Sequence, residues 1–235
     1  MPPSQRTNVV QRLSNPKWVL FEKPLGETAR DYIELERQIK LKDFSGTVNY
    51  NLINIRSIKK LRLKKLQSLR ISLSSELPEV KNTFEHLVHF FYLTEYLLRE
   101  TIVKLERKDN EKVIIYCCTL SSGILVDWEL RKGPASWSLS GESEKLILHF
   151  NIRNLKLSII PKENNMISGF RFSCVEFYEN ILQYSSAIAE KMLTSGYSYG
   201  TIYSFIHGVV CRNDLQLIIK REKRWLEMLE KSHGY

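Results

Sequence analysis

The sequence has no apolar run that approaches the roughly 18 uninterrupted residues of a membrane-spanning helix, which argues against an integral membrane protein. Its first residues, Met1 to Arg6, lead into a mixed polar stretch without the apolar core of a secretory signal. Apolar residues make up 43% of the chain and charged residues 26%, which is ordinary for a folded globular protein. We therefore expect a soluble, cytoplasmic protein.

Cysteine is scarce, and its spacing excludes the common cysteine-based sites. The chain has four cysteines, none of them in the C-x-x-C spacing of a redox or zinc motif. Cys117 and Cys118 are adjacent within an apolar, strand-like run, which indicates reduced core thiols and not a disulfide framework. His86 and His89 lie three residues apart, but no further histidine or cysteine is placed to complete a site. The sequence therefore predicts no bound metal.

Acidic residues are missing from one stretch of the chain. Residues 56–70 hold seven basic side chains and no acidic one, and the whole chain carries a formal net charge of +9. Such an excess attracts nucleic acid, an anionic membrane surface or a phosphorylated ligand, although a charge run is as often only a solvated face. The chain has no zinc finger, helix-turn-helix or RNA-binding signature. Nucleic-acid binding thus rests on charge alone, and the sequence disfavours it.

The order of the predicted elements changes along the chain. Residues 18–21 form a buried strand, Thr28 caps a helix over residues 29–40, and residues 46–51 form another short strand. Further on, strand-like runs follow one another at short turns, which is typical of an antiparallel meander. The predicted strands cover residues 66–73, 101–107, 112–119, 124–130, 136–139, 146–151 and 155–160, and the predicted helices cover residues 82–99, 174–193 and 201–229. This order predicts an α+β fold.

Three short motifs carry a resemblance to one enzyme family. The first strand ends in Glu22-Lys23-Pro24-Leu25, the next ends in Val48-Asn49-Tyr50-Asn51, and a later helix holds Glu85 and His89 at a spacing of four. The opening Pro2-Pro3-Ser4-Gln5-Arg6 is similar to a Thr-Pro-Pro loop of that family, with arginine where histidine is frequent. In the order and spacing of these motifs, the chain resembles the Gfo/Idh/MocA family of oxidoreductases, named after glucose-fructose oxidoreductase and inositol dehydrogenase.

The resemblance implies a division of the chain. Residues 1–53 would be a remnant of a Rossmann-type α/β domain, the C-terminal part of a dinucleotide-binding domain. Residues 54–235 would form a substrate-binding and oligomerisation domain with an open, mainly antiparallel sheet that helices cover on one face. The resemblance also implies NAD or NADP as the cofactor, bound near Glu22, Lys23 and Pro24, and a sugar, sugar nucleotide or cyclic polyol as the substrate.

Three residues would carry the chemistry that the resemblance implies. His89 would accept the proton of a substrate hydroxyl, Lys23 would hold the substrate oxygen and stabilise a developing alkoxide, and Glu85 would orient His89. A spacing of four residues places Glu85 and His89 on one helix face, which Tyr92 extends. The predicted substrate-binding residues are Tyr50, Asn51 and Tyr92.

The sequence also departs from this family. No G-x-G-x-x-G dinucleotide loop occurs, and Glu85 stands where the family has an aspartate, which displaces the carboxylate by one methylene. We therefore expect a truncated or degenerate oxidoreductase that is inactive alone, with a separately encoded nucleotide-binding half as one partner.

The alternative hypothesis is a non-catalytic structural or oligomerisation role. An open sheet with one uncovered face is expected to expose a large apolar patch, which calls for a partner, and a homo-oligomer through that face would supply it. The edge of the strand over residues 18–21 is a second place where another chain would pair.

Overall fold

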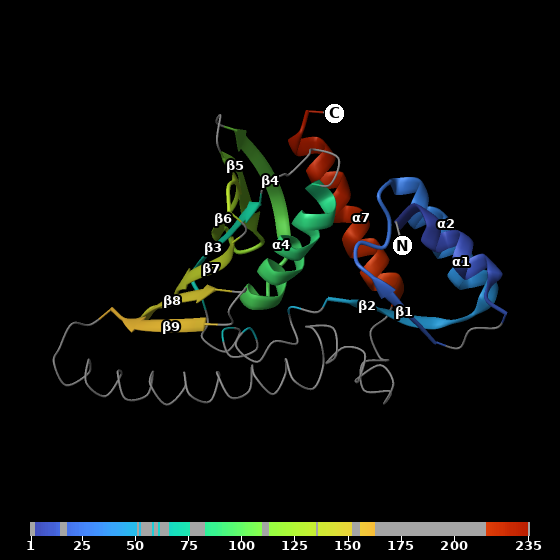
Figure 1. The fold of residues 1–235 in the computed structure, drawn as a ribbon, viewed down its shortest axis with the longest axis horizontal. Helices are drawn as coiled ribbons and strands as arrows, with labels where there is room; N and C mark the ends of the chain where they lie inside the picture. The colour runs from blue at the N-terminus through green and yellow to red at the C-terminus, as the bar shows by residue number, and fades with distance from the viewer. Residues whose placement is uncertain are drawn as a thin grey trace.

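The computed structural model describes residues 3–14, 18–50, 52, 58, 61, 66–75, 83–109, 113–134, 136–151, 156–162 and 215–234. Within these ranges the chain is an α+β protein with one small and one large sheet, which confirms the predicted fold class (Figure 1). Several predicted features lie outside the described residues, namely Asn51, most of the basic run 56–70 and the helix over 174–193.

The first elements form a small parallel unit of α1 (Pro3–Arg12), β1 (Trp18–Glu22), α2 (Ala29–Lys42) and β2 (Ser45–Asn49). β1 and β2 pair in parallel, so α2 is the crossover helix between them. Thr28 begins α2 with a capping box, in which its side chain accepts from the Asp31 amide and the Asp31 carboxylate accepts from the Thr28 amide. The predicted helix is thus confirmed, with Tyr32 and Leu35 on its buried side.

The large sheet has seven strands in the order β4-β5-β6-β3-β7-β8-β9 among the described residues. The strands are β3 (Ser68–Ser75), β4 (Ile102–Asp109), β5 (Val113–Leu120), β6 (Leu125–Lys132), β7 (Ser136–Glu142), β8 (Leu146–Asn151) and β9 (Lys156–Pro161). Every neighbouring pair is antiparallel except β3 with β6, which confirms the predicted, mainly antiparallel sheet. The strands β6 and β7 are consecutive in the sequence, but they do not pair, because β3 lies between them.

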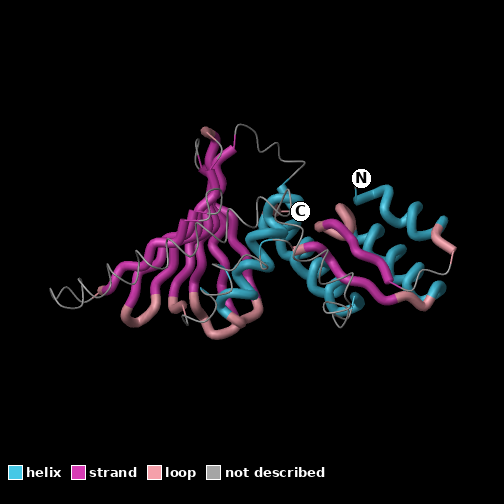
Figure 2. The backbone as a smooth tube through the Cα atoms, turned by 60° about the horizontal axis from the view of Figure 1, so that its bottom comes forward, coloured by secondary structure: helices cyan, strands magenta, loops and turns pink. Residues whose placement is uncertain are grey.

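Two helices, α4 (Thr83–Leu98) and α7 (Leu215–Ser232), lie on the same side of this sheet (Figure 2). All side chains from Leu87 to Thr94 are buried, as expected for a helix that is apolar around most of its surface. The helix α7 is amphipathic and buries Ile218, Ile219 and Trp225 on one stripe. It contacts α2 and β2 as well as α4 and β4, so it joins the small parallel unit to the large sheet (Figure 1).

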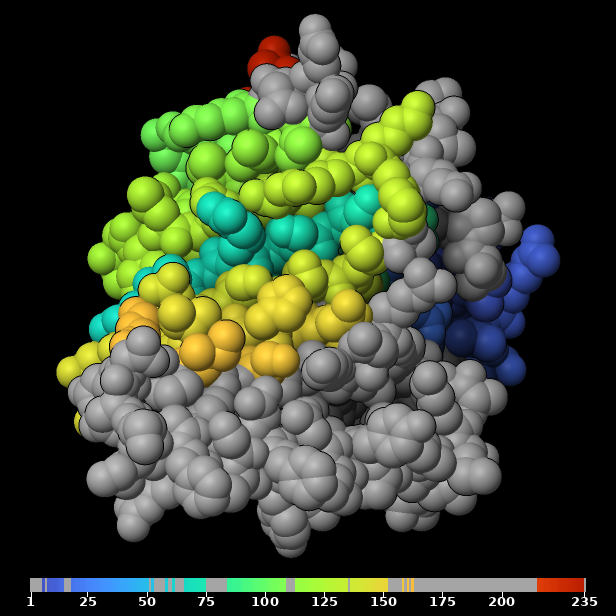
Figure 3. Space-filling view, turned by 60° about the vertical axis from the view of Figure 1, so that its left-hand side comes forward, coloured from blue at the N-terminus to red at the C-terminus, as the bar shows by residue number. Residues whose placement is uncertain are grey.

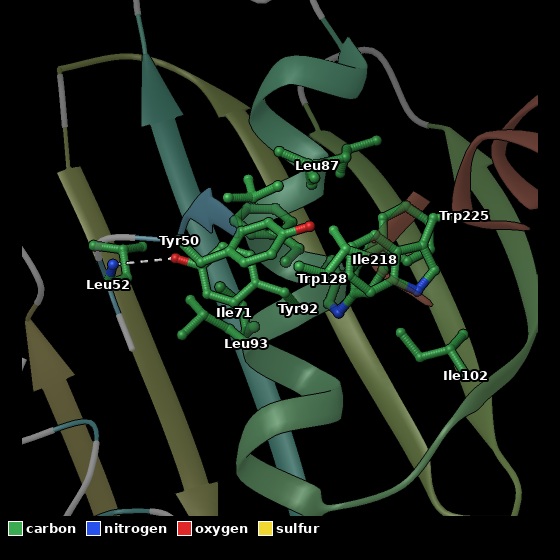
Figure 4. Close-up of a cluster of buried hydrophobic side chains, with 14 of the residues drawn as sticks. Tyr50, Leu52, Ile71, Leu87, Tyr92, Leu93, Ile102, Trp128, Ile218 and Trp225 are labelled. Atoms are coloured by element: carbon green, nitrogen blue, oxygen red, sulfur yellow. Dashed lines mark hydrogen bonds between the residues drawn. The ribbon is translucent and has the colours of Figure 1, made fainter. Parts of the chain in front are cut away.

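The core between helices and sheet is rich in aromatic rings. Trp128 of β6 packs edge-on against Phe91 of α4 with ring centroids 4.7 Å apart, and Phe91 stacks on Trp225 of α7 at 5.3 Å. The Trp128 indole donates a hydrogen bond of 3.0 Å to the Thr94 hydroxyl, so its polar atom has a partner inside the core. Figure 4 shows Trp128 and Trp225 as members of this cluster.

The opposite face of the large sheet is mainly polar in the described residues, and Figure 3 shows strands of this sheet across the molecule with β3 (teal) in the middle. Arg70 of β3 pairs with Asp127 of β6 at 3.4 Å, and Ser140 of β7 bonds His149 of β8 at 3.0 Å. Exposed apolar side chains such as Ile147 are interspersed among these groups. The expectation of a large apolar patch is therefore wrong for this part of the sheet, because the outward positions alternate with the core ones and carry serine and charge.

None of the helices in these ranges is long and apolar enough to span a membrane.

Candidate functional site

The carboxyl ends of β1 and β2 lie side by side, because the parallel register pairs Glu22 with Asn49. The Asn49 side-chain amide donates a hydrogen bond of 2.7 Å to the Glu22 carboxylate, which ties the two strand ends together. Lys23 and Tyr50 are the next residues of the two strands, so both side chains start from one edge of the small sheet. In open α/β sheets, this edge is where ligands bind.

Arg6 holds the turn that follows β1. Its buried guanidinium donates to the main-chain carbonyl oxygen of Glu22 and, at 3.5 Å, to that of Lys23. The Lys23–Pro24 peptide bond is cis. Arg6 was not among the predicted site residues. Its place in the Pro2-Pro3 loop, where the family often has histidine, is the signal that could have identified it. In the structure it is the residue that fixes the main chain beside Lys23.

Lys23 spans the distance from β1 to the first turn of α4. Its ammonium group donates a hydrogen bond of 3.1 Å to the main-chain carbonyl oxygen of Glu85, 62 residues away in the sequence. Burial lowers the pKa of Lys23, and the negative charges of Glu85 and Glu22 offset part of that effect. The structure therefore brings together Lys23 and the helix that carries the predicted base His89.

His89 is buried on α4, with 8% of its surface exposed. Its Nδ1 lies 3.3 Å from the Tyr92 hydroxyl, and its ring packs edge-on against Trp137 of β7 at 5.1 Å. Burial places the pKa of His89 well below 6.5, and the positive charges of Lys23 and His86 lower it further. The imidazole is therefore neutral near pH 7 and able to accept a proton.

Glu85 does not have the contact with His89 that the sequence predicts. Its side chain is exposed at the start of α4, whereas His89 is buried, and among the described residues the hydrogen-bond partner of His89 is Tyr92. The helical spacing of four does place both residues on one side of α4. Glu85, however, lies in the exposed first turn of the helix, whereas His89 lies in the buried second turn. Glu85 instead contributes its carbonyl oxygen, which accepts from Lys23.

Tyr50 and Tyr92 form a buried ring pair behind this edge, with centroids 4.5 Å apart (Figure 4). The Tyr92 hydroxyl accepts a hydrogen bond of 3.2 Å from the Leu52 amide, and the Tyr50 hydroxyl donates to the Glu222 carboxylate. Burial raises the pKa of both phenols, so both stay protonated. Tyr92 thus belongs to the core and not to a half-exposed polar face, while Asn51, the third predicted substrate-binding residue, lies outside the described residues.

Sequence reasoning missed Glu222, the carboxylate that joins the small parallel unit to α7. Glu222 is fully buried, and it accepts hydrogen bonds from the Leu25 amide at 2.7 Å, from the Tyr32 hydroxyl at 3.1 Å and from the Tyr50 hydroxyl. Burial raises its pKa, and the donated hydrogen bonds oppose that shift. A signal existed, because an acidic residue at this position interrupts the apolar stripe between Ile219 and Trp225.

The residues of the small unit do not fit the pyrophosphate of a dinucleotide. Such a group binds at the exposed amides of a helix N-terminus, but here the Asp31 carboxylate accepts hydrogen bonds of 2.9 Å from the amides of Glu27 and Thr28. A pyrophosphate would meet this negative charge. The described residues also include no cluster of histidine, cysteine and acidic groups that would hold a metal ion.

No protein-family model and no curated protein matches the sequence. Solved structures do match the fold. A dehydrogenase from Chromobacterium violaceum is 11% identical, with a TM-score of 0.68 over 100% of this chain and 78% of that one. UDP-N-acetylglucosamine 3-dehydrogenase GnnA from Acidithiobacillus ferrooxidans is 13% identical, with a TM-score of 0.57 over 71% of this chain and 58% of that one.

A third similar structure is an NAD binding oxidoreductase from Klebsiella pneumoniae, which is 12% identical and has a TM-score of 0.60 over 98% of this chain and 74% of that one. In the GnnA match, this chain spans less than two thirds of the enzyme's length. Identities this low establish a common fold and leave the activity open. The chain therefore has the fold of dehydrogenases and oxidoreductases, which is the fold that its motifs predict.

Proposed function

We propose that this chain is the substrate-handling part of an NAD(P)-dependent oxidoreductase of the Gfo/Idh/MocA type, whose substrate is a sugar, sugar nucleotide or cyclic polyol. One observation carries the proposal: the ammonium group of Lys23 reaches the helix of His89 and bonds the Glu85 carbonyl at 3.1 Å. A cation whose charge acts on a neutral imidazole, at the carboxyl edge of parallel strands, suits the oxidation of an alcohol. The parallel unit β1–α2–β2 is, in this proposal, the end of a Rossmann-type domain.

Lys23 and His89 have separate roles in the proposed reaction. The substrate hydroxyl binds beside the Lys23 ammonium group, which stabilises the negative charge that develops on the oxygen. His89 takes the hydroxyl proton. In the tautomer that donates from Nδ1 to the Tyr92 hydroxyl, the lone pair for that proton is on Nε2. The charge of Lys23 also keeps the imidazole neutral before the reaction, because it disfavours a second positive charge nearby.

In this proposed reaction, no hydride step runs through a cofactor held by the small unit, because the Asp31 carboxylate already accepts hydrogen bonds from the amides of Glu27 and Thr28, just before α2. In this proposal, the nucleotide is bound by a part of the enzyme other than this parallel unit. We therefore expect the isolated chain not to bind NADH or NADPH at micromolar concentrations. Nicotinamide fluorescence during a titration measures this, and micromolar binding by the isolated chain would contradict the expected incapacity.

Substrate binding by the isolated chain tests the proposal directly. Saturation-transfer NMR with myo-inositol, glucose and UDP-N-acetylglucosamine should detect binding of at least one of them. The variants Lys23→Met and His89→Gln should weaken that binding by about tenfold or more, because each removes a polar contact to the substrate oxygen. The matched control is Lys40→Met, since Lys40 is an exposed lysine of α2 remote from the strand ends. No binding of any of the three, or equal binding by all variants, would contradict the proposal.

A second candidate function is a non-catalytic role as a homo-oligomer through the open face of the large sheet. Its support is two exposed apolar side chains, Leu125 and Ile147, which line a hollow of about 300 Å³ on that otherwise mainly polar face. Light scattering at high concentration should then report a dimer or larger species. The substitution Ile147→Glu should dissociate it, whereas Leu217→Glu on the exposed side of α7 should not. A strictly monomeric wild-type chain would rule out this candidate.

A further inference from the structure

A second cleft lies further along α4, away from the Lys23 contact. It has a volume of about 380 Å³ and opens between the end of α4, the turn into β4 and the middle of α7. The residues that line it are Tyr50, Tyr92, Glu95, Tyr96, Arg99, Glu100, Thr101 and Arg221. The cleft shares the ring pair Tyr50 and Tyr92 with the candidate site, but Lys23, Glu85 and His89 are not among the residues that line it.

The two carboxylates of the cleft already have donors from the protein. Glu95 accepts hydrogen bonds from the Trp225 indole at 3.2 Å and the Ile102 amide at 3.1 Å, and it forms an ion pair with Arg224. Glu100 accepts from the Ser122 amide at 2.9 Å. These bonds hold both negative charges at the rim and leave them little capacity to bind a further cation.

The two arginines of the cleft are in a different situation. The Arg221 guanidinium lies over the ring of Tyr50 at 5.5 Å and over that of Trp225 at 5.0 Å, and its Nε is buried without a hydrogen-bond partner. Arg99 is exposed at the end of α4. In the described part of the chain, neither Arg99 nor Arg221 forms an ion pair with a carboxylate. Arg221 also forms a side-chain hydrogen bond with the Tyr50 hydroxyl. Both guanidinium groups keep N–H donors that no carboxylate of the described residues accepts.

We propose that this cleft binds the oxyanion of a small molecule, a phosphate or carboxylate group, between Arg99 and Arg221. Guanidinium groups bind such anions through paired, charge-assisted hydrogen bonds. Contact with the rings of Tyr50 and Trp225 holds the Arg221 side chain in one place, which lowers the entropy lost on binding. The aromatic walls of Tyr92 and Tyr96 give the rest of such a ligand a surface to pack on.

Binding of simple anions by the full chain tests this site. The probes are inorganic phosphate and malonate, followed by isothermal calorimetry, with sodium chloride at matched ionic strength as the reference. Saturable binding of phosphate only, of malonate only, or of both supports the site and tells which oxyanion it prefers. No saturable binding of either anion beyond that of chloride would overturn the proposal.

Variants locate the bound anion. Arg221→Gln and Arg99→Asn should each weaken binding at least about tenfold, because each removes a charge-assisted hydrogen bond. Asparagine suits position 99, where φ is 59°, because it tolerates the left-handed backbone region. Lys220→Gln, the loss of an exposed neighbour on α7, should leave affinity unchanged. Arg221→Lys should recover only part of the affinity, since it restores the charge without the planar fork.

Two outcomes separate this inference from the proposed function. If Arg221→Gln fails to fold, Arg99→Asn still tests the site, because Arg99 is exposed. Anion binding that survives both substitutions would overturn the inference, whatever the sugar titrations show. Anion binding that is lost in Arg99→Asn but kept in Lys23→Met would support it independently of those titrations.

Discussion

The hydroxyl of Tyr50 donates a hydrogen bond to the carboxylate of Glu222, a residue 172 positions away on the last helix. Tyr50 directly follows β2, and the same carboxylate also accepts from the Leu25 amide, just after the Lys23–Pro24 turn. One buried carboxylate thus holds the two strand ends of the candidate site against α7.

Removal of the Glu222 carboxylate should destabilise the whole fold. The substitution Glu222→Leu leaves the Leu25 amide and the hydroxyls of Tyr32 and Tyr50 buried without their acceptor, and at about 1–3 kcal/mol for each such group we expect a loss of about 3 kcal/mol or more. Glu222→Gln keeps an acceptor oxygen and should cost less. Urea denaturation gives the free energy of unfolding. Glu230→Gln, on the exposed side of the same helix, serves as the control and should have little effect.

The burial of His89 predicts that acid destabilises the protein. The pKa of His89 is lowered in the folded state, so between that value and 6.5 only the unfolded chain binds the proton. Proton binding by His89 therefore leaves the free energy of unfolding unchanged above pH 6.5. Below pH 6.5 it lowers the free energy of unfolding by about 1.4 kcal/mol for each pH unit, down to the pKa of the folded state.

Urea denaturation at several pH values between 5 and 8 checks this. The variant His89→Gln should show a smaller decline below pH 6.5 than the wild type, and His149→Gln, which changes an exposed histidine of β8, should decline as the wild type does. Parallel pH profiles for wild type and His89→Gln would contradict the assignment.

Gly46 should not tolerate a side chain. A Cβ at this position would lie 2.6 Å from the Val19 carbonyl oxygen and 3.0 Å from a methyl group of Leu215, so Gly46→Ala must separate β1, β2 or α7. We expect a loss of about 1–3 kcal/mol in the free energy of unfolding. Gly123→Asn is the comparison and should cost less, because a Cβ at position 123 would have no atom within 4 Å, and asparagine tolerates the positive φ of 88° better than other residues with a side chain.

The hydrogen bond from Trp128 to Thr94 should show a clear coupling. Thr94→Val leaves the buried indole N–H without its acceptor, which costs about 1–3 kcal/mol. Trp128→Phe creates a cavity and removes the donor, so Thr94→Val should cost much less in that background. A double-mutant cycle by thermal or urea unfolding measures the difference. Equal costs of Thr94→Val in both backgrounds would mean that the hydrogen bond contributes nothing.

Local sequence patterns determined much of the secondary structure. The Thr28–Asp31 capping box begins α2 where the sequence predicts, and the apolar spacing that follows is the buried side of that helix. A continuous apolar run likewise predicted the strand over residues 112–119, which the structure gives as Val113–Leu120. These features depend on neighbours within a few residues, so they can be read from the sequence directly.

The approach of Lys23 to the helix of His89 was also predictable, but only through the family resemblance of short motifs. No local rule connects residues 62 positions apart, such as Lys23 and Glu85. The groups through which Glu85 and His89 make their contacts were still not predictable. Glu85 meets Lys23 through its main chain, and His89 meets Tyr92, because burial of the second turn of α4 decides which groups point inward.

What only the tertiary structure decided is the set of long-range pairings. Strand β3 lies between β6 and β7, Glu222 accepts hydrogen bonds from three separate segments, and Arg221 packs on the rings of Tyr50 and Trp225. The sequence by itself determined which segments are helices and strands and which side of each is apolar, since these follow from local spacing. It did not determine which apolar sides meet, because many pairings bury similar area, and the choice depends on the packing of all the elements at once.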